Sequence, residues 1–573
     1  MSLGTIVNGV KPGRSSGRPG LFLAILTPVI VVLCLFPIAR LIFQGVWQEG
    51  AFSAVHLTKV LAEQETWRAT WHSLFISAAG TIVSVLIGGV FAFLVALTDI
   101  RHKAALVFCF MLPMMIPPQI TALSWLQMFG PTSAFLKMIG LAPPLGSRQP
   151  LYSQWGIALL LGIQHASLIF LTLRAALRQV PREQVEAARL AGAHGLRVWR
   201  DVILPITSPA LIAGVALTFV TAIGNFGISA MLGIPANIQM LPTLIYSKLS
   251  SFGPSILSEV AVLAILIGII AAVGVITHHH LVKGRDYRLH GIVGKPLDIS
   301  LGRYRLLVEI FVWLVLFFIL IVPLIALVSA SMVPAYGMTL SFETATLDAF
   351  REVMFRQAAT ARAFVNSFGL SIGAALALFL LTVPLAYGMM KRRNGLAQIL
   401  NIIIEIPYAL PGIVLAIACI LTFQRIPLAG ISLYGTLGII FIAYLARFFV
   451  VSLRPVVSSF QQMDPNLEEA AQACGASAAR RLIDILLPAV APSAAAGGLL
   501  VFLTAFNELT VSALLWSSGN ETLGVIIFNL DDSGESVLAS AVAVLVVVVI
   551  IALMGLIEFM GNRLPKGVIP WRS

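Results

Sequence analysis

Two carboxylates stand inside long apolar stretches of this chain, where a charged side chain is costly and usually faces a pathway or a partner. They are Glu405 and Glu508. Asn507 precedes Glu508, and Thr510 follows two residues later, so a single apolar stretch carries three polar groups together. We predict no catalytic residue in the chain. These groups therefore indicate binding or passage of a polar solute, without a covalent reaction.

A related polar group stands earlier in the chain, in a segment that resembles the one around Glu508. Asn225 occupies the position that matches Glu508, and Ser229 lies close to it. We interpret five residues as facing a central cavity through which a solute crosses: Asn225, Ser229, Asn507, Glu508 and Thr510. The alternative is that these side chains form hydrogen bonds between helices of one half of the protein.

A short motif, E-A-A-x-x-x-G followed after twelve residues by a proline, occurs twice. Its residues are Glu186, Ala187, Ala188, Gly192 and Pro205 in the first copy and Glu469, Ala470, Ala471, Gly475 and Pro488 in the second. Acidic residues suit the positive N-terminal end of a helix, and a glycine with φ > 0 suits its end. The alanines leave a narrow face that another backbone can approach. We expect a short exposed helix that docks a soluble partner, and a proline that fixes the return of the chain into the membrane.

Prolines break two apolar spans at equivalent places. They are Pro113, Pro117 and Pro118 in one span and Pro407 and Pro411 in the other. Such prolines could form discontinuous helices that gate a path, or they could be static kinks. The sequence leaves both interpretations open.

Metal and thiol chemistry are not indicated. The run His278-His279-His280 ends an apolar span and fits a polar patch at the membrane surface better than a metal site. The four cysteines are spread singly, which favours neither a disulfide framework nor a zinc site. We therefore predict no metal site and no cofactor bound by this chain.

The elements that position these residues are membrane helices. Of the 573 residues, 58% are hydrophobic and 11% are charged, against about 25% charged residues in soluble domains. The predicted fold class is an all-α polytopic membrane protein with about twelve transmembrane helices, each long enough to cross about 30 Å of hydrocarbon. The first six spans are 20–43, 72–99, 104–128, 154–173, 206–232 and 258–277, and the second six are 306–330, 364–390, 397–424, 434–453, 489–515 and 538–560.

The distribution of Lys and Arg predicts the orientation of these spans. With the N-terminus inside, the cytoplasmic segments contain 26 of the 37 Lys and Arg residues, and both termini are cytoplasmic. The segments are 1–19, 100–103, 174–205, 278–305, 391–396, 454–488 and 561–573. This pattern fits a multi-pass protein of the bacterial inner membrane. Since the basic residues lie beside apolar spans, we expect lipid and not nucleic acid as their partner.

The chain also contains a long internal repeat. Glu186 and Glu469 are separated by 283 residues, and Ser73 and Ser367 by 294. We infer two homologous six-helix halves. The expected organisation is a tail (1–19), a first half (20–277) with one E-A-A loop (181–205), a linker (278–305), a second half (306–560) with another E-A-A loop (464–488), and a tail (561–573).

With these loops the chain resembles the permease subunits of binding-protein-dependent ABC importers, the MetI-like family with the type I importer fold. The resemblance implies that each E-A-A loop folds as a coupling helix on an ATPase subunit. Two ATPase copies, which bind ATP and Mg, and a periplasmic solute-binding protein are the implied partners. The residues agree, because the chain has no G-x-x-x-x-G-K-[ST] phosphate loop and ATP hydrolysis is expected on a separate chain.

The fused arrangement of two halves is similar to that of ferric-iron permeases, as are the stretches that begin at Asn225 and Asn507. Ferric iron is therefore the first expectation for the solute. Permeases for 2-aminoethylphosphonate, thiamine and polyamines are close alternatives. A secondary transporter is the alternative from another class, and a structural membrane scaffold is a third, but neither is expected to carry paired E-A-A loops.

Overall fold

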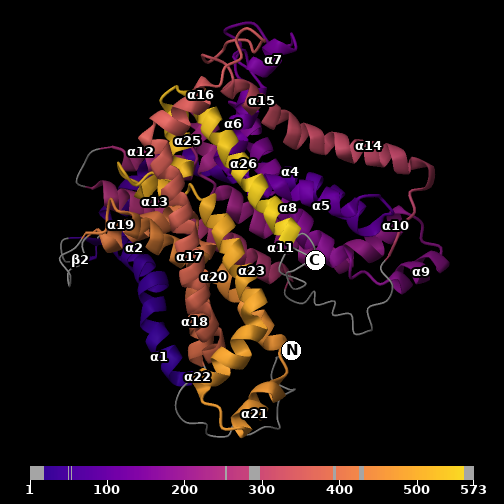
Figure 1. The fold of residues 1–573 in the computed structure, drawn as a ribbon, viewed down its shortest axis with the longest axis vertical. Coiled ribbons are helices and arrows are strands. Elements are labelled where there is room, and N and C mark those ends of the chain that lie inside the picture. Colours follow the sequence, from indigo (N-terminus) through magenta and orange to yellow (C-terminus); the bar gives the residue numbers. More distant parts are fainter. Residues whose placement is uncertain are drawn as a thin grey trace.

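The computed structural model describes residues 19–48, 51–52, 54–251, 255–282, 297–391, 395–424 and 432–560. Helices make up nearly all of this part of the chain (Figure 1), together with a small antiparallel hairpin of β1 (Trp47–Gln48) and β2 (Ala51–Phe52). Residues 1–18 and 561–573 of the expected tails, and residues 283–296 of the expected linker, lie outside the described residues.

The helices follow the same order in each half of the chain. In the first half they are α1 (Pro19–Ile30), α2 (Phe36–Val46), α3 (Val55–Ala62), α4 (Gln64–Leu97), α5 (Lys103–Met115), α6 (Pro118–Met128), α7 (Ala134–Met138), α8 (Gln154–Leu177), α9 (Arg182–Leu190), α10 (Leu196–Val198), α11 (Leu204–Ile223), α12 (Leu241–Leu249) and α13 (Ile256–Val282). In the second half they are α14 (Arg305–Leu316), α15 (Val322–Ser331), α16 (Asp348–Arg351), α17 (Ala358–Lys391), α18 (Gly395–Ala409), α19 (Gly412–Phe423), α20 (Leu437–Gln462), α21 (Pro465–Ala473), α22 (Ala478–Arg481), α23 (Leu487–Phe506), α24 (Ser512–Leu515), α25 (Leu523–Asp532) and α26 (Ser536–Met560).

The expected all-α membrane fold with about twelve spans is confirmed. Among the described residues, ten helices are long and apolar enough to cross a membrane, and two bent helix pairs bring the number to twelve. The bent pairs are α5 with α6, at 99°, and α18 with α19, at 109°. The breaks fall at Pro117 and Pro118 and at Pro411, whereas Pro113 lies inside α5 and Pro407 inside α18. Proline removes a backbone donor and crowds the preceding turn, which explains the breaks.

Each half has a core of three long helices, α4, α8 and α11 in the first half and α17, α20 and α23 in the second. Small residues allow close approach of these helices. A Cβ atom at Gly80 of α4 would lie 3.0 Å from the carbonyl oxygen of Ala158 in α8, and one at Gly497 of α23 would lie 2.9 Å from that of Ser452 in α20. Close backbone approach thus occurs in both halves, between α4 and α8 in the first and between α20 and α23 in the second.

The repeat found in the sequence is also present in the hydrogen bonds. Ser73 accepts a hydrogen bond from the backbone N–H of Leu241 at 2.7 Å, and Ser367 accepts one from that of Leu523 at 2.9 Å. Ser73 and Ser367 are the pair that the sequence related at an offset of 294. The two bonds fasten α12 and α25 to the long helices α4 and α17 in the same way.

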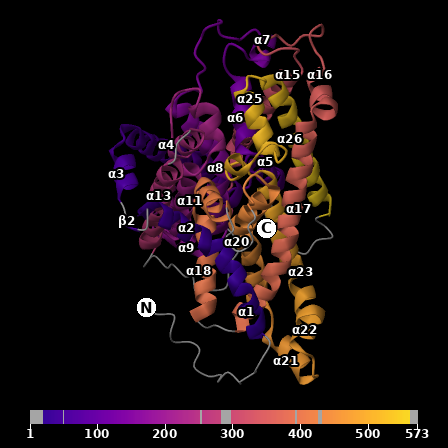
Figure 2. The same ribbon diagram turned by 90° about the vertical axis from the view of Figure 1, so that its left-hand side faces the viewer.

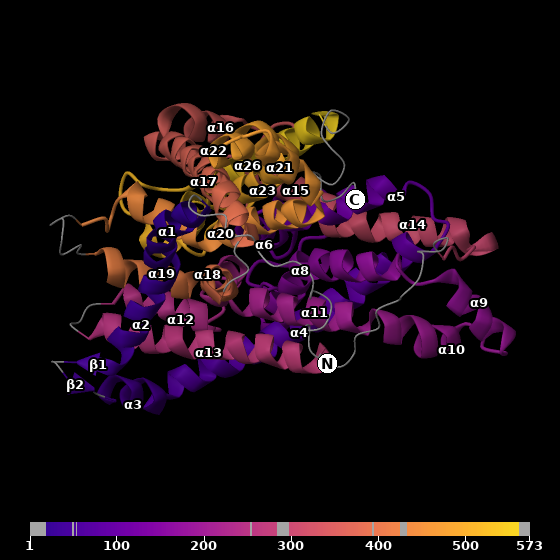
Figure 3. The ribbon, with the colours of Figure 1, turned by 90° about the horizontal axis from the view of Figure 1, so that it is seen from below.

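The first span of each half bridges to the other half. In the first half, α1 packs against α17, and α2 packs against α19. In the second half, α15 packs against α6, and α14 lies beside α5. Figures 2 and 3 show α1 beside helices of the second half, and Figure 3 shows α14 along α5. The halves are therefore interlocked, with a long contact between them.

Two expected spans, 206–232 and 489–515, are wrong as continuous helices. The first is interrupted after α11 by residues 224–226, and the second after α23 by residues 507–511. At both breaks, a polar side chain caps the next turn by accepting a backbone N–H. Asn225 accepts from Ile228 N–H at 3.0 Å, and Glu508 accepts from Val511 N–H at 2.9 Å. A side chain that binds a nearby backbone N–H favours a new turn over a continued helix.

The prolines of the E-A-A loops lie inside longer helical stretches. These stretches run from Leu196 to Ile223 around Pro205 and from Leu482 to Phe506 around Pro488. A π-helical turn stands directly before each proline's helix, at Trp199–Ile203 and at Leu482–Leu486. Since the proline ring crowds the preceding turn, the helix widens there and continues.

Candidate functional site

The two E-A-A motifs form short helices with the same ending. Gly192 and Gly475 have φ angles of +85° and +80°, which confirms that each glycine ends its helix. The N–H of the next residue donates to the second alanine of the motif, Ala188 O at 2.9 Å and Ala471 O at 3.0 Å. This is the Schellman arrangement of helix ends, and an L-residue is disfavoured at its φ > 0 position.

The prolines at the N-terminal ends of α9 and α21 stand at positions that differ by one residue. Pro465 is the first residue of α21, after Asp464, whose carboxylate accepts the Asn466 N–H at 2.9 Å. Pro181 precedes α9 in the capping position. The helices therefore correspond at the single offset of 283, and Pro181 corresponds to Asp464.

The motif residues Glu186 and Ala187 of α9 and Glu469 and Ala470 of α21 are exposed. Glu186 pairs with Arg182 one turn earlier at 2.6 Å, and this carboxylate raises the pKa of the Arg182 guanidinium. Figure 1 shows α9 and α21 at two separate corners of the molecule. Two equivalent, exposed helices are thus presented to the outside of the bundle.

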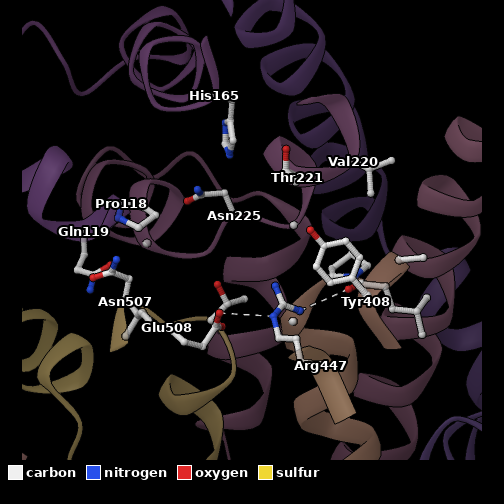
Figure 4. A pocket seen from close by; sticks show the side chains of 18 residues that line it. Pro118, Gln119, His165, Val220, Thr221, Asn225, Tyr408, Arg447, Asn507 and Glu508 are labelled. Atoms are coloured by element: carbon white, nitrogen blue, oxygen red, sulfur yellow. Dashed lines mark hydrogen bonds and ion pairs between the residues drawn. The ribbon is translucent and has the colours of Figure 1, made fainter. Parts of the chain in front are cut away.

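A cavity of about 220 Å³ lies where the two halves meet, at the breaks after α5, α11, α18 and α23. Four of the five residues predicted to face a cavity line it: Asn225, Asn507, Glu508 and Thr510. Ser229 does not line it, since it is fully buried and donates to the Met240 sulfur at 3.2 Å. Figure 4 shows Asn225 from the first half facing Asn507 and Glu508 from the second.

A larger and mostly apolar cavity of about 500 Å³ shares several lining residues with the first, among them Arg447, Asn507 and Glu508. It extends along α11 and α23 past Ala213 and Leu500, toward the ends of these helices that follow the E-A-A loops. Together the two cavities lead from the polar centre toward the side of the molecule that carries α9 and α21.

Glu508 is held by a cation that the sequence analysis did not single out. Arg447 Nε lies 3.4 Å from Glu508 Oε2, and the two side chains are 20% and 10% exposed. Figure 4 shows the pair side by side at the cavity wall. Arg447 stands in the apolar span 434–453, so a charge inside a span was the signal that could have revealed it.

The first half has neutral residues at the positions of this ion pair. At the offset of 283, Arg447 corresponds to Gln164 and Glu508 to Asn225. Gln164 donates to the carbonyl oxygen of Ile116 at 3.1 Å, and Arg447 donates to that of Leu410 at 3.5 Å. These carbonyls lie at equivalent breaks, where helix ends leave acceptors unpaired. Both halves thus use position 164/447 to support the break, but only the second adds a charged pair.

Asn507 joins the two halves across the cavity. Its amide donates to the carbonyl oxygen of Met115, the last residue of α5, at 2.6 Å. The Asn507 amide oxygen and the Gln119 amide oxygen are buried without a hydrogen-bond partner. His165, which Figure 4 shows above Asn225, also lines the cavity. The polar lining is therefore richer than the sequence indicated.

The other polar residues named from the sequence lie apart from this cavity. Glu405 pairs with Arg454 and accepts from Asn401 at 3.0 Å, and neither Glu405 nor Arg454 lines the cavity. His278 lines the larger cavity. Among the described residues, no group of three or more His, Cys, Asp or Glu side chains could hold a metal ion.

Comparison with known proteins assigns the chain to a family. The profile of the family described as binding-protein-dependent transport system inner membrane component matches residues 84–285 and 381–565, once in each half. The chain belongs to this family. The paired matches also agree with two homologous halves. They support the permease family over the two alternatives, a secondary transporter and a membrane scaffold.

Relatives of similar length are permease proteins. A probable ABC transporter permease protein, y4fN of Sinorhizobium fredii, is 26% identical and the match covers 96% of this chain and 97% of that protein. The ferric transport system permease protein FbpB of Actinobacillus pleuropneumoniae is 23% identical over 94% of this chain and 78% of its own length. The putative 2-aminoethylphosphonate transport system permease protein PhnU of Salmonella typhimurium is 36% identical, but over 24% of this chain and 46% of that protein.

Proposed function

We propose that this chain is the transmembrane permease subunit of an ATP-driven importer in a bacterial inner membrane, with both termini in the cytoplasm. The observation that carries the proposal is the pair of exposed helices α9 and α21, which share sequence, exposure and helix ending. One copy of an ATPase subunit docks on each helix, and a periplasmic binding protein delivers the solute. ATP and Mg are bound by the ATPase and not by this chain.

The central cavity is the proposed path of the solute. Its walls come from both halves, at the breaks that directly follow α11 and α23. Because α11 and α23 also follow the E-A-A loops, a displacement of α9 and α21 reaches the cavity through one continuous helix in each half. The permease thus couples two sites by a change of conformation, and it does so without chemistry of its own.

Docking is tested by the double variant Glu186→Lys plus Glu469→Lys. Both residues are exposed, and an exposed i,i+4 pair such as Glu186 with Arg182 contributes little to stability, so folding should be preserved. Co-purification of the ATPase should be lost. The control is Asp348→Lys, a charge reversal at a residue 74% exposed on α16, which should keep the ATPase bound. Retention of the ATPase by the double variant would refute the docking role.

For the solute we propose ferric iron. The support is the full-length similarity to a ferric transport permease, together with a cavity that contains the Glu508 carboxylate. Uptake of radioactive iron by liposomes that contain the permease, its ATPase and the binding protein encoded beside it tests this proposal. Uptake that fails with iron but succeeds with another solute would refute it.

A second candidate solute is 2-aminoethylphosphonate. One observation favours it: the most identical segment among the relatives described above belongs to a permease named for that compound. The cavity offers a cation, Arg447, beside an anion, Glu508, which is the arrangement that a zwitterion would need. Thiamine and polyamines are further candidates, and they are tested as unlabelled competitors in the uptake assay. Competition of unlabelled phosphonate against the transported label separates the two proposals.

A further inference from the structure

The second E-A-A helix rests on a buried polar network. Glu468 of α21 points away from the exposed face, and its side chain is 7% exposed. The hydroxyl of Tyr387 in α17 donates to Glu468 Oε1 at 2.9 Å. Arg481 of α22 places its Nε 3.5 Å from the same oxygen, with a side chain that is 12% exposed. A carboxylate, a phenol and a guanidinium thus meet beneath α21.

Arg481 also ties this network to the turn that ends α21. Its Nη1 donates to the carbonyl oxygen of Ala476 at 2.9 Å, one residue after Gly475. The network therefore joins α17 to α21 by a hydrogen bond, and it joins α22 to α21 by an ion pair and by the hydrogen bond to the turn after Gly475. Removing one partner of such a buried network leaves a charged or polar group unpaired, which is strongly unfavourable.

The equivalent positions of the first half are apolar. At the offset of 283, Glu468 corresponds to Val185 and Arg481 to Val198, and at the offset of 294, Tyr387 corresponds to Phe93. Val185 and Val198 are buried, and they line one apolar groove together with Phe93.

The first-half groove is further closed by the end of the linker. Leu297 and Ile299 line the groove beside Val185. The backbone N–H of Ile299 donates to Leu97 O at 2.7 Å, which fastens this segment to the end of α4. The two E-A-A helices are thus equally exposed, but α21 is held by a polar network and α9 by apolar contacts.

We propose that Tyr387, Glu468 and Arg481 are positioning residues that transmit the movement of the ATPase into the second half. The inference rests on the proposed docking of an ATPase on α9 and α21. Apolar contacts are non-directional and allow one surface to shift over another. Hydrogen bonds and ion pairs hold a defined geometry, so α21 moves with α17 as one body, whereas α9 can slip over its groove.

Three variants test this in liposomes that contain the permease, its ATPase and the binding protein. Glu468→Gln and Arg481→Met each leave one buried group without its charged partner. They should keep the ATPase bound but lower the solute transported per ATP hydrolysed by about tenfold, the size expected from losing a bond to a charged group. The charge-matched control is Arg356→Met, outside both E-A-A loops at a side chain that is 76% exposed, and its ratio should stay within about twofold.

The decisive variant is the triple replacement Tyr387→Phe, Glu468→Val and Arg481→Val, which copies the first-half contacts into the second half. It should fold and bind the ATPase, since no buried charge is left without its partner, yet its transport per ATP should remain low. A triple variant with the unmodified ratio would overturn the proposal, as would Glu468→Gln with an unchanged ratio.

A readout without the ATPase guards against failure to fold or to assemble. In the purified permease, Glu468→Gln should speed hydrogen–deuterium exchange in α21 and leave exchange in α9 unchanged. If exchange in α21 is the same in the variant and the unmodified permease, the proposed positioning role of the network is wrong. If the unmodified permease binds no ATPase, the proposed docking and this inference both fail. Normal docking of the ATPase, together with an unchanged ratio of solute transported to ATP hydrolysed, refutes only the positioning role of the network.

Discussion

The double variant R447Q/E508N asks whether the ion pair in the central cavity serves the fold or the passage of solute. It replaces both residues by their first-half counterparts, Gln164 and Asn225. In the structure, Gln164 already supports a helix break by a hydrogen bond to a carbonyl, and Asn225 already accepts a backbone N–H three residues on. The same bonds can form in the double variant, so the breaks should persist.

The magnitudes follow from the burial of the pair. Removing one member of a fully buried pair costs about 3–5 kcal/mol. Because Arg447 and Glu508 are 20% and 10% exposed and meet at a single 3.4 Å contact, each single variant should lose about 2 kcal/mol. The double variant should lose less than about 1 kcal/mol, which corresponds to a coupling energy of at least about 3 kcal/mol.

The assay compares all four proteins in detergent at one scan rate, because unfolding of such a protein is governed by kinetics. Each kcal/mol of lost stability lowers the melting temperature by at most about 2–4 °C. The single variants should therefore melt about 5 °C lower, and the double variant should melt within about 3 °C of the unmodified protein. Solute uptake by the double variant should nevertheless fall by at least about tenfold. A double variant as unstable as the two single changes combined would show that the pair serves the fold. A stable double variant with normal uptake would show that the pair is not used in transport.

Three further predictions follow from local geometry. Gly192→Ala or Gly475→Ala should weaken ATPase binding and speed hydrogen exchange at the end of the altered helix, since an L-residue at φ > 0 costs about 1–2 kcal/mol; equal exchange would contradict this. Gln164→Leu leaves two carbonyls of the broken helix without their donor, so the free energy of unfolding should fall by about 1–3 kcal/mol and the melting temperature should fall with it. An unchanged melting temperature would refute the role of this amide. Burial alone would raise the pKa of Glu521, but a backbone N–H and Arg362 hold that pKa below its usual value. The stability it contributes is thus present above the ordinary glutamate pKa of about 4.3 and lost as pH falls through the lower folded value, so the melting difference from Glu521→Gln should shrink below about pH 4; a constant difference would refute it.

Local features of the sequence were sufficient for the larger part of the fold. Apolar spans, basic loops and the repeat depend on residues near one another in the chain, and so does the ending of α9 and α21 at Gly192 and Gly475. The breaks at Asn225 and Glu508 were missed because a polar side chain inside an apolar run looks the same whether its helix continues or begins anew. The bond to the backbone three residues on decides between the two.

The sequence by itself determined that this protein lies in the membrane as two homologous halves with one exposed E-A-A helix each. Tertiary structure alone decided which polar residues meet. Arg447 and Glu508 are 61 residues apart, and Asn507 reaches Met115 in the other half, so neither contact has a trace in local spacing. The physical reason is that burial in a low-dielectric interior makes the partner of a charge decisive, and only helix packing selects that partner.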